Sequence, residues 1–186
     1  MDDIVKAAIA KWPNVPDCRG WLALDARGHW YLRDELAQAR GPFPQVKGSR
    51  ILHEKLRAFI ERNYESDAQG CWYFQNGPQR VFVELELTPL VMGVQRLGDG
   101  WVVHAHTGAQ VRAVREVLVD EQGRLLLHTE LGLGLVRSPD MDCAADAVLA
   151  GAWVPTPVDS AGLPQRFGYC LSPQALAGGL PTTGSA

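Results

Sequence analysis

The clearest pattern in the chain is an alternation of apolar and polar residues over positions 79–87. Valine and leucine occupy every second position, with Phe82, Glu84 and Glu86 between them. Because successive side chains of a strand point to opposite faces, the alternation predicts a β-strand with one buried face. An Asn-Gly-Pro turn separates it from the aromatic residues 71–75, so these two segments are expected to form a hairpin.

The remaining part of the chain's second half also reads as short strands joined by tight turns. Strands at this spacing are typical of a sandwich or a partly open barrel. After them, Ser138-Pro139 predicts the start of a helix, with a capping residue followed by proline in the first turn. The seven strands are predicted at 71–75, 79–87, 90–96, 101–107, 112–119, 124–130 and 133–137.

The first half reads as mixed helix and strand. Residues 50–63 have apolar side chains at helical spacing, with Ser49 as the expected cap. Shorter helices are predicted at 2–12 and 34–40, and a hairpin over 20–33. The stripe of the longest helix, which we expect to be buried, contains Leu52, Leu56, Phe59, Ile60 and Asn63.

A nine-residue segment is repeated along the chain. DARGHWYLR at 25–33 and DAQGCWYFQ at 67–75 share five identical positions, and DEQGRLLLH at 120–128 is a weaker copy. Asp-x-x-Gly predicts a tight turn in which the aspartate binds its own backbone and the glycine is left-handed. The shared Trp-Tyr pair favours a duplicated structural unit over a common hairpin sequence.

Composition and charge exclude several classes of protein. A net charge of −3 over 186 residues argues against non-specific binding of nucleic acid. The four cysteines are far apart, which predicts free thiols rather than a disulfide framework or a zinc site. The acidic N-terminus does not resemble a signal peptide, and no apolar run reaches 18 residues. We therefore expect a cytoplasmic protein without membrane insertion.

Six residues are candidates for binding a small ligand. Cationic side chains lie near the predicted start of the helix at 50–63. The N-terminus of a helix is itself electropositive, so together they could hold an anion. The simpler interpretation is that these side chains are solvated. The hairpin around 76–78 carries amides and an arginine beside aromatic residues, a combination that can bind phosphate or stack on a base, or that can instead bridge two subdomains. The six candidates are Arg50, His53, Trp72, Asn76, Gln79 and Arg80.

A metal site has less support. His104 and His106 lie two apart on a predicted strand and should point to the same face. His128 and a carboxylate of Glu84 or Glu86 could approach them, but no third ligand stands at a telling spacing. No motif of nucleophilic catalysis or phosphate binding is present, so no catalytic residue, metal ligand or cofactor is assigned.

Three segments together resemble a small uncharacterised family found mainly in proteobacteria: GWLALDARGHWY, SRILHEKLRAFIERNY and GCWYFQNGPQRVFVELELTP. The arrangement over residues 17–137 is also similar to a larger bacterial family of unknown function. That resemblance implies a duplicated core, a C-terminal half like a pleckstrin-homology fold, a nucleotide-type ligand in the cleft between the halves, and a role in signalling. The insertion at 41–48 and the tail after Leu149 depart from it.

The sequence therefore predicts an α+β protein with a duplicated strand–helix core and a C-terminal antiparallel half closed by a helix. We expect an N-terminal subdomain at 1–66, a β-rich subdomain at 67–153, and a Pro/Gly-rich wrap at 154–186 that frays after Tyr169. The first hypothesis is a non-enzymatic binding or sensor module for an anionic, nucleotide-like ligand. The alternatives are a protein-interaction adaptor using a sheet edge or a patch near Trp101, with a protein partner or a second copy, and then a metal-dependent enzyme.

Overall fold

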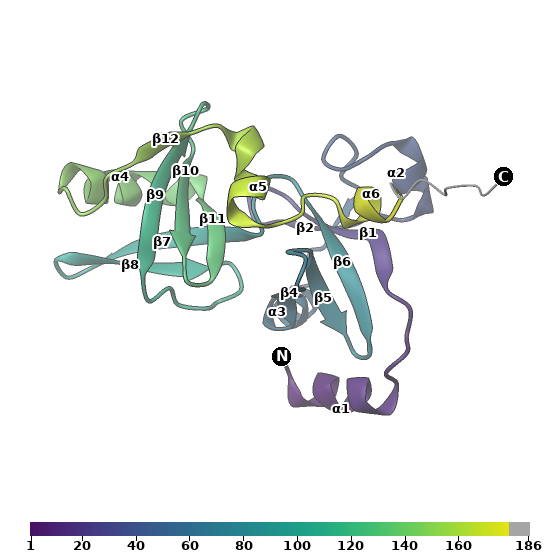
Figure 1. Cartoon of the computed structure of the whole chain (residues 1–186). Coiled ribbons are helices and arrows are strands. Elements are labelled where there is room, and N and C mark those ends of the chain that lie inside the picture. Colours follow the sequence, from purple (N-terminus) through teal and green to yellow (C-terminus); the bar gives the residue numbers. More distant parts are fainter. Residues whose placement is uncertain (179–186) are drawn as a thin grey trace.

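Two six-stranded sheets make up the protein, and they stand beside each other in the computed structural model, which describes residues 1–178 (Figure 1). At the centre of the first sheet β1 and β6 run parallel, and every other pairing in it is antiparallel. The order of the first sheet is β3 (Ser49–Arg50), β2 (Trp30–Leu32), β1 (Cys18–Leu24), β6 (Gln79–Leu85), β5 (Trp72–Asn76), β4 (Tyr64–Ser66).

The second sheet is also mixed. An antiparallel meander is flanked on both sides by parallel pairings, of β12 with β9 and of β11 with β7. The order of this sheet is β12 (Thr156–Val158), β9 (Val114–Asp120), β10 (Leu125–Thr129), β11 (Gly132–Val136), β7 (Leu90–Leu97), β8 (Gly100–Ala105).

Short helices lie around the sheets. Helix α4 packs on β7, and α6 packs on β1 and β6 of the other sheet. The α-helices are α1 (Asp3–Lys11), α2 (Glu35–Arg40), α3 (Glu54–Arg62), α4 (Met141–Leu149), α5 (Leu163–Phe167) and α6 (Pro173–Gly178), with 3₁₀ turns η1 (Ser138–Asp140) and η2 (Ser160–Gly162).

The predicted α+β class with two halves is confirmed, and each of the seven predicted strands is present within two residues of its expected bounds. The chain changes sheet at residues 86–89, whereas we expected a subdomain boundary between residues 66 and 67. The hairpin of β5 and β6 stays in the first sheet because β6 pairs in parallel with β1, a partner that is distant in sequence.

The three Asp-x-x-Gly segments form the same turn. In each, the aspartate Oδ1 accepts the backbone N–H groups two and four residues later, at 2.8–3.0 Å. The glycines are left-handed, as predicted: φ is 81° at Gly28, 76° at Gly70 and 74° at Gly123. One aspartate therefore satisfies two backbone donors that the tight turn leaves unpaired within the chain.

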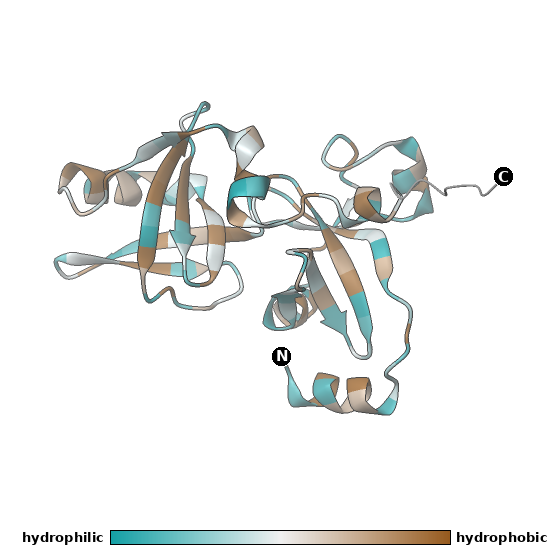
Figure 2. Cartoon of the chain, in the orientation of Figure 1, coloured by the Kyte–Doolittle hydropathy of each residue, from teal (hydrophilic) through white to brown (hydrophobic). Residues whose placement is uncertain are grey.

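Both copies that carry the Trp-Tyr pair lie in the first sheet, and the third copy lies in the second sheet. Trp30 and Trp72 pack on the same side chain, Tyr64, with ring centroids 5.2 Å and 4.7 Å away. Tyr64 is buried and also contacts His106 from the other half, at 5.8 Å. One hydrophobic core consequently contains buried residues of both sheets. Figure 2 shows the hydrophobic residues along the strands of each sheet.

The helix predicted at 50–63 starts later than expected. Ser49 and Arg50 form the edge strand β3, and His53, not Ser49, caps α3. The predicted stripe was wrong for Leu52, which is 70% exposed, and for Leu56, which is 43% exposed. Periodicity alone overestimated the helix, because the pairing of β3 with β2 holds its first residues extended.

Strand β6 is covered on both faces, whereas the alternation of its residues predicted only one buried face. Glu84 is only 3% exposed, since residues 170–178 lie across this second face. Its carboxylate accepts the Ser172 hydroxyl and, at 3.0 Å, the Gln174 N–H. The wrap thus stays ordered through Gly178, and the expectation of fraying after Tyr169 was wrong for these residues. The rest of the expected tail, 179–186, lies outside the described residues.

Gly70 and Gly123 offer a matched test of the repeated turn. An alanine at either position adopts left-handed backbone, costing about 1–2 kcal/mol. At residue 70 the new Cβ would also meet the Gly168 carbonyl oxygen, whereas at residue 123 it meets open space. We expect Gly70→Ala to lower the free energy of unfolding clearly more than Gly123→Ala in urea denaturation. Equal losses would contradict the close approach of the C-terminal segment to this turn.

Candidate functional site

Three of the six predicted ligand residues lie together at the tip of the β5–β6 hairpin, but two of them use their polar groups to bind the segment before β1. Gln79 donates its Nε2–H to the Pro16 carbonyl at 3.0 Å. Arg80 forms an ion pair with Asp17 at 3.2 Å, and Asn76 is exposed. The hairpin tip therefore anchors residues 16–17, the segment that leads into β1.

Of the other three, two lie outside this hairpin, and Trp72 lies at the far end of β5. Arg50 is exposed on β3, opposite Tyr31 of β2. His53 caps α3, where its Nδ1 accepts the Leu56 N–H at 3.2 Å. Trp72 stacks on the core and lines a hollow of about 250 Å³ at the end of β5 away from Asn76. The structure therefore does not bring the six candidates into one site.

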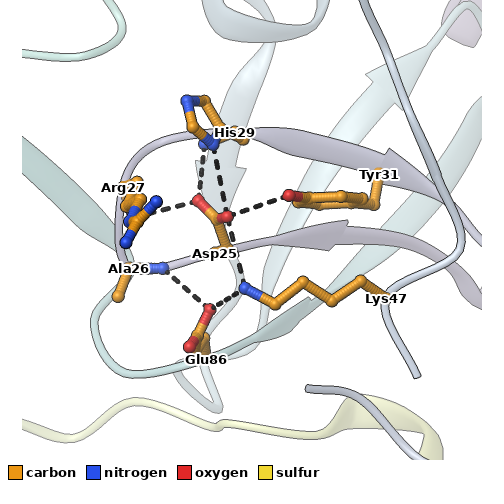
Figure 3. A network of polar contacts seen from close by, with 7 residues as sticks. All are labelled: Asp25, Ala26, Arg27, His29, Tyr31, Lys47 and Glu86. Atoms are coloured by element: carbon orange, nitrogen blue, oxygen red, sulfur yellow. Dashed lines mark hydrogen bonds and ion pairs between the residues drawn. The ribbon is translucent and has the colours of Figure 1, made fainter. Parts of the chain in front are cut away.

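A dense polar cluster surrounds Asp25, which is 3% exposed (Figure 3). Its Oδ1 accepts the N–H groups of Arg27 and His29, at 2.9 Å and 2.8 Å. Its Oδ2 accepts the Tyr31 hydroxyl at 3.1 Å and lies 3.3 Å from the Lys47 Nζ. Burial alone would raise the pKa of Asp25, but the backbone N–H groups of His29 and Arg27 and the charges of His29 and Lys47 together hold it below its usual value.

Lys47 links this cluster to the end of β6. Its Nζ lies 2.8 Å from the Glu86 carboxylate, which also accepts the Ala26 N–H at 3.2 Å. Partial burial by itself would lower the pKa of Lys47. The carboxylates of Glu86 and Asp25 have the larger effect, so the pKa lies above its usual value. Lys47 belongs to the insertion at 41–48, so this insertion supplies a cation to the Asp25 turn and not to the start of α3.

The Asp25 turn presents two side chains, of Arg27 and His29, to a hollow of about 420 Å³ that Arg137, Ser138 and Pro139 also line. We call it the Arg27 hollow. Arg27 and His29 come from the first half of the chain, while Arg137 to Pro139 follow β11 of the second half. The hollow therefore lies between the two halves.

Arg137 is held in a fixed position at the Arg27 hollow. Its Nη2 donates to Asp140 at 2.6 Å, and the same carboxylate accepts the Val94 N–H at 3.0 Å. A Cβ at Gly93 would lie 2.9 Å from this Nη2, so the glycine leaves the space that the guanidinium fills. Arg27 is exposed and takes part in none of the ion pairs found among residues 1–178.

A second hollow, of about 370 Å³, shares Arg137 and is lined also by Gly93, Gln95, His104 and His106; we call it the His104 hollow. The His106 Nδ1 accepts the Val91 N–H at 3.2 Å, so the proton of a neutral ring is on Nε2. Burial lowers the pKa of His106 to about 4, which makes it neutral at pH 7. The Nε2–H is buried and has no acceptor within the described chain.

The histidines do not form the metal site considered from the sequence. Within residues 1–178, no three His, Cys, Asp or Glu side chains are grouped to hold a metal ion. His128 instead lies 3.0 Å from Glu116, and Glu84 and Glu86 bind Ser172 and Lys47. All four cysteines are free, as predicted. In the part of the chain that the structure describes, no helix has the length and apolar character needed to cross a bilayer.

Sequence reasoning missed Arg27, His29 and Arg137. The Asp-x-x-Gly turn was recognised as a structural signal, but its third and fifth positions were not read as side chains that line a hollow. They differ between the copies: Arg27 and His29 correspond to Gln69 and Cys71 in the second. This difference between two otherwise similar turns was the feature of the sequence that could have singled out Arg27 and His29.

The fold defines an α+β protein with two mixed sheets, a shared core and an arginine-lined hollow between its halves. The chain belongs to the family DUF2944, described as "Protein of unknown function (DUF2946)", whose model matches residues 1–174. The prediction of an uncharacterised family is thus confirmed. No curated protein matches the chain in a sequence search.

Two solved structures of DUF1285 family proteins are similar to the chain. One, from Silicibacter pomeroyi, is 14% identical with a TM-score of 0.49, over 78% of this chain and 84% of that protein. The other, from Shewanella baltica, is 14% identical with a TM-score of 0.46, over 68% of this chain and 91% of that protein.

The Asp25 cluster gives a pH-dependent prediction. Asp25→Asn replaces one carboxylate oxygen by a donor, so bonds to Tyr31 and Lys47 are lost, and we expect a loss of about 1–3 kcal/mol at pH 7. A lowered carboxyl pKa contributes stability above its unfolded value, and this contribution disappears on acidification. The difference from wild type should therefore shrink below about pH 4.

Asp67→Asn is the matched control in urea denaturation from pH 3 to 8, because Asp67 occupies the same turn position but accepts only backbone N–H groups. It should cost less at pH 7 than Asp25→Asn. Equal costs at the two turns would show that the side-chain contacts of Asp25 add nothing.

Proposed function

We propose that this protein is a non-enzymatic binding module that senses a small anionic, nucleotide-like ligand in the Arg27 hollow. One observation carries the proposal: arginines from both halves of the chain, Arg27 and Arg137, line the same hollow together with His29 and Ser138. No carboxylate lines this hollow, since Asp25 and Asp140 are engaged by their own neighbours.

The chemistry of the lining suits a phosphate or polyphosphate group. A guanidinium presents paired N–H donors that match phosphate oxygens, and a hydroxyl such as that of Ser138 adds a further donor. The volume of about 420 Å³ falls within the range of about 300–1,000 Å³ that is usual for small-molecule sites. The adjoining His104 hollow extends the space beyond Arg137 and contains the unpaired Nε2–H of His106.

Ligand binding across the two halves gives a physical basis for sensing. Arg27 belongs to the β1–β2 turn, and Arg137 connects β11 to η1. An anion contacting both would tie these segments together and stabilise the folded chain by an amount set by its concentration and affinity. The cytoplasmic location and a signalling role remain proposals that follow from such a ligand.

The proposal is tested by thermal shift and titration calorimetry with inorganic phosphate, pyrophosphate and the adenine and guanine nucleotides. A ligand at 100 times its Kd should stabilise the wild-type chain by about 2.7 kcal/mol. Arg27→Ala and Arg137→Ala should each weaken binding roughly 10- to 100-fold, as expected for loss of a charge-assisted hydrogen bond. Gly93→Ala should also weaken binding, because its Cβ displaces the Arg137 guanidinium.

Arg80→Ala is the matched control, since it removes the same charge from the β5–β6 hairpin. It should leave the affinity unchanged if the ligand occupies the Arg27 hollow. A loss of binding in Arg80→Ala, with Arg27→Ala unaffected, would instead place the ligand at the hairpin residues Asn76, Gln79 and Arg80. No stabilisation of the wild type by any of these compounds would count against an anion-binding function altogether.

A protein-interaction adaptor is the second candidate function. The observation that favours it is a larger hollow, of about 580 Å³, that lies in the second sheet beside Trp101. It is separate from the Arg27 hollow in its lining residues, so the two functions can be tested independently.

A further inference from the structure

The second sheet curls until its edge strand β8 touches the segment that leads into β9. The Val111 N–H donates to the Val103 carbonyl at 2.9 Å, and His104 bridges Gln110. This contact partly closes the sheet into a barrel. Beyond it the two strands separate, and the gap between them is the hollow of about 580 Å³.

Each wall of this gap contains a stretch of unpaired strand edge. On one wall, β8 is the last strand of the sheet, and residues 109–111 occupy its outer edge at 103–105, so residues 100–102 have no strand partner on that side. On the other wall, β12 begins to pair with β9 at Leu118, opposite Thr156, so residues 114–117 have no strand partner on that side. Unpaired edges of this kind present rows of backbone donors and acceptors that can template another strand.

We propose that this gap is a docking groove for an extended acidic peptide of a partner protein, which adds a strand between β8 and β9. This proposal goes beyond the anion-binding function and does not depend on it. Strand addition obtains affinity from main-chain hydrogen bonds and specificity from alternate side chains. In this groove the apolar walls for such side chains are Trp101, Val103 and Trp153.

Two features argue for an acceptor-rich, acidic occupant. The Nε1–H of Trp101, on the wall of the groove, is buried without a hydrogen-bond acceptor in residues 1–178. The exposed Arg115 takes part in no ion pair within the same residues, while the carboxylate of Glu116 is engaged by Arg166 and His128. The free charge at the groove is therefore positive, which complements an acidic partner.

The experiment pans the full chain against a phage-displayed library of random 12-residue peptides and measures the selected peptides by fluorescence anisotropy. Selected peptides should carry acidic residues and apolar side chains at every second position, with Kd of roughly 10 µM or tighter. Arg115→Glu should weaken binding at least about tenfold. Trp101→Phe, which keeps the ring but removes the donor, should weaken it roughly three- to tenfold.

Methylation of single peptide amides gives a readout that only strand addition predicts. Methylating an amide of either alternate set within the docked segment should weaken binding, because successive N–H groups of a strand point in opposite directions, one set toward β8 and the other toward β9. Arg40→Glu is the matched control: it makes the same charge reversal on an exposed arginine of the first half and should not change the affinity.

Failure to select any peptide, or selection of peptides with helical spacing, would overturn the proposal. So would binding that survives methylation of every amide in turn. A concentration-dependent dimer in sedimentation, lost in Arg115→Glu, would also overturn it by assigning the groove to a second copy of the chain.

Discussion

Tyr64 holds the two halves of this protein in one arrangement. Its ring packs between Trp30 and Trp72 of its own sheet and against His106 of the other, and its hydroxyl donates to the Pro89 carbonyl at 3.0 Å. Pro89 lies in the short link where the chain changes sheet. A buried phenol needs such an acceptor, and burial raises its pKa well above the usual value. The Arg27 hollow between the halves keeps its shape because the side chains of this junction are closely packed and the Tyr64 hydroxyl has its hydrogen-bond acceptor.

Acidic side chains in this protein largely serve the backbone. Asp25, Asp67 and Asp120 each satisfy two N–H groups of a turn, and Glu84 and Glu130 accept backbone N–H groups far away in the sequence. Each of these carboxylates is therefore either engaged by backbone N–H groups alone or divided between backbone N–H groups and a neighbouring cation. A chain with a net charge of −3 can consequently present positive surfaces at Arg27 and Arg115, which its overall composition would not indicate.

The sequence predicted those parts of the fold that local chemistry decides. The Asp-x-x-Gly turns, the strands around them and the helix after Ser138 depend on residues within a few positions of one another. It failed where a distant segment decides the outcome. Glu84 looked solvent-facing because nothing near it indicates that Ser172 and Gln174 would cover it. Leu52 looked buried because periodicity does not show that β3 pulls the chain away from the helix.

The candidate site shows the same division. Arg80 and Gln79 were correctly located on a hairpin, but their partners, Asp17 and Pro16, are about sixty residues away and occupy their polar groups. Arg27 and Arg137 are more than a hundred residues apart and meet only because β11 pairs with β7 beside the first turn. Such convergence is a property of topology, and a pattern within one segment does not contain it.

The coverage of Glu84 has a consequence for biosynthesis. Residues 172–174 follow nearly all of the described chain, so they leave the ribosome after both sheets have been translated. Until then, the nascent first sheet carries an unpaired carboxylate on a face that its own strands cannot shield. Water can solvate that group during elongation, and its later binding to Ser172 and Gln174 makes the docking of α6 one of the last steps in the folding of the first sheet.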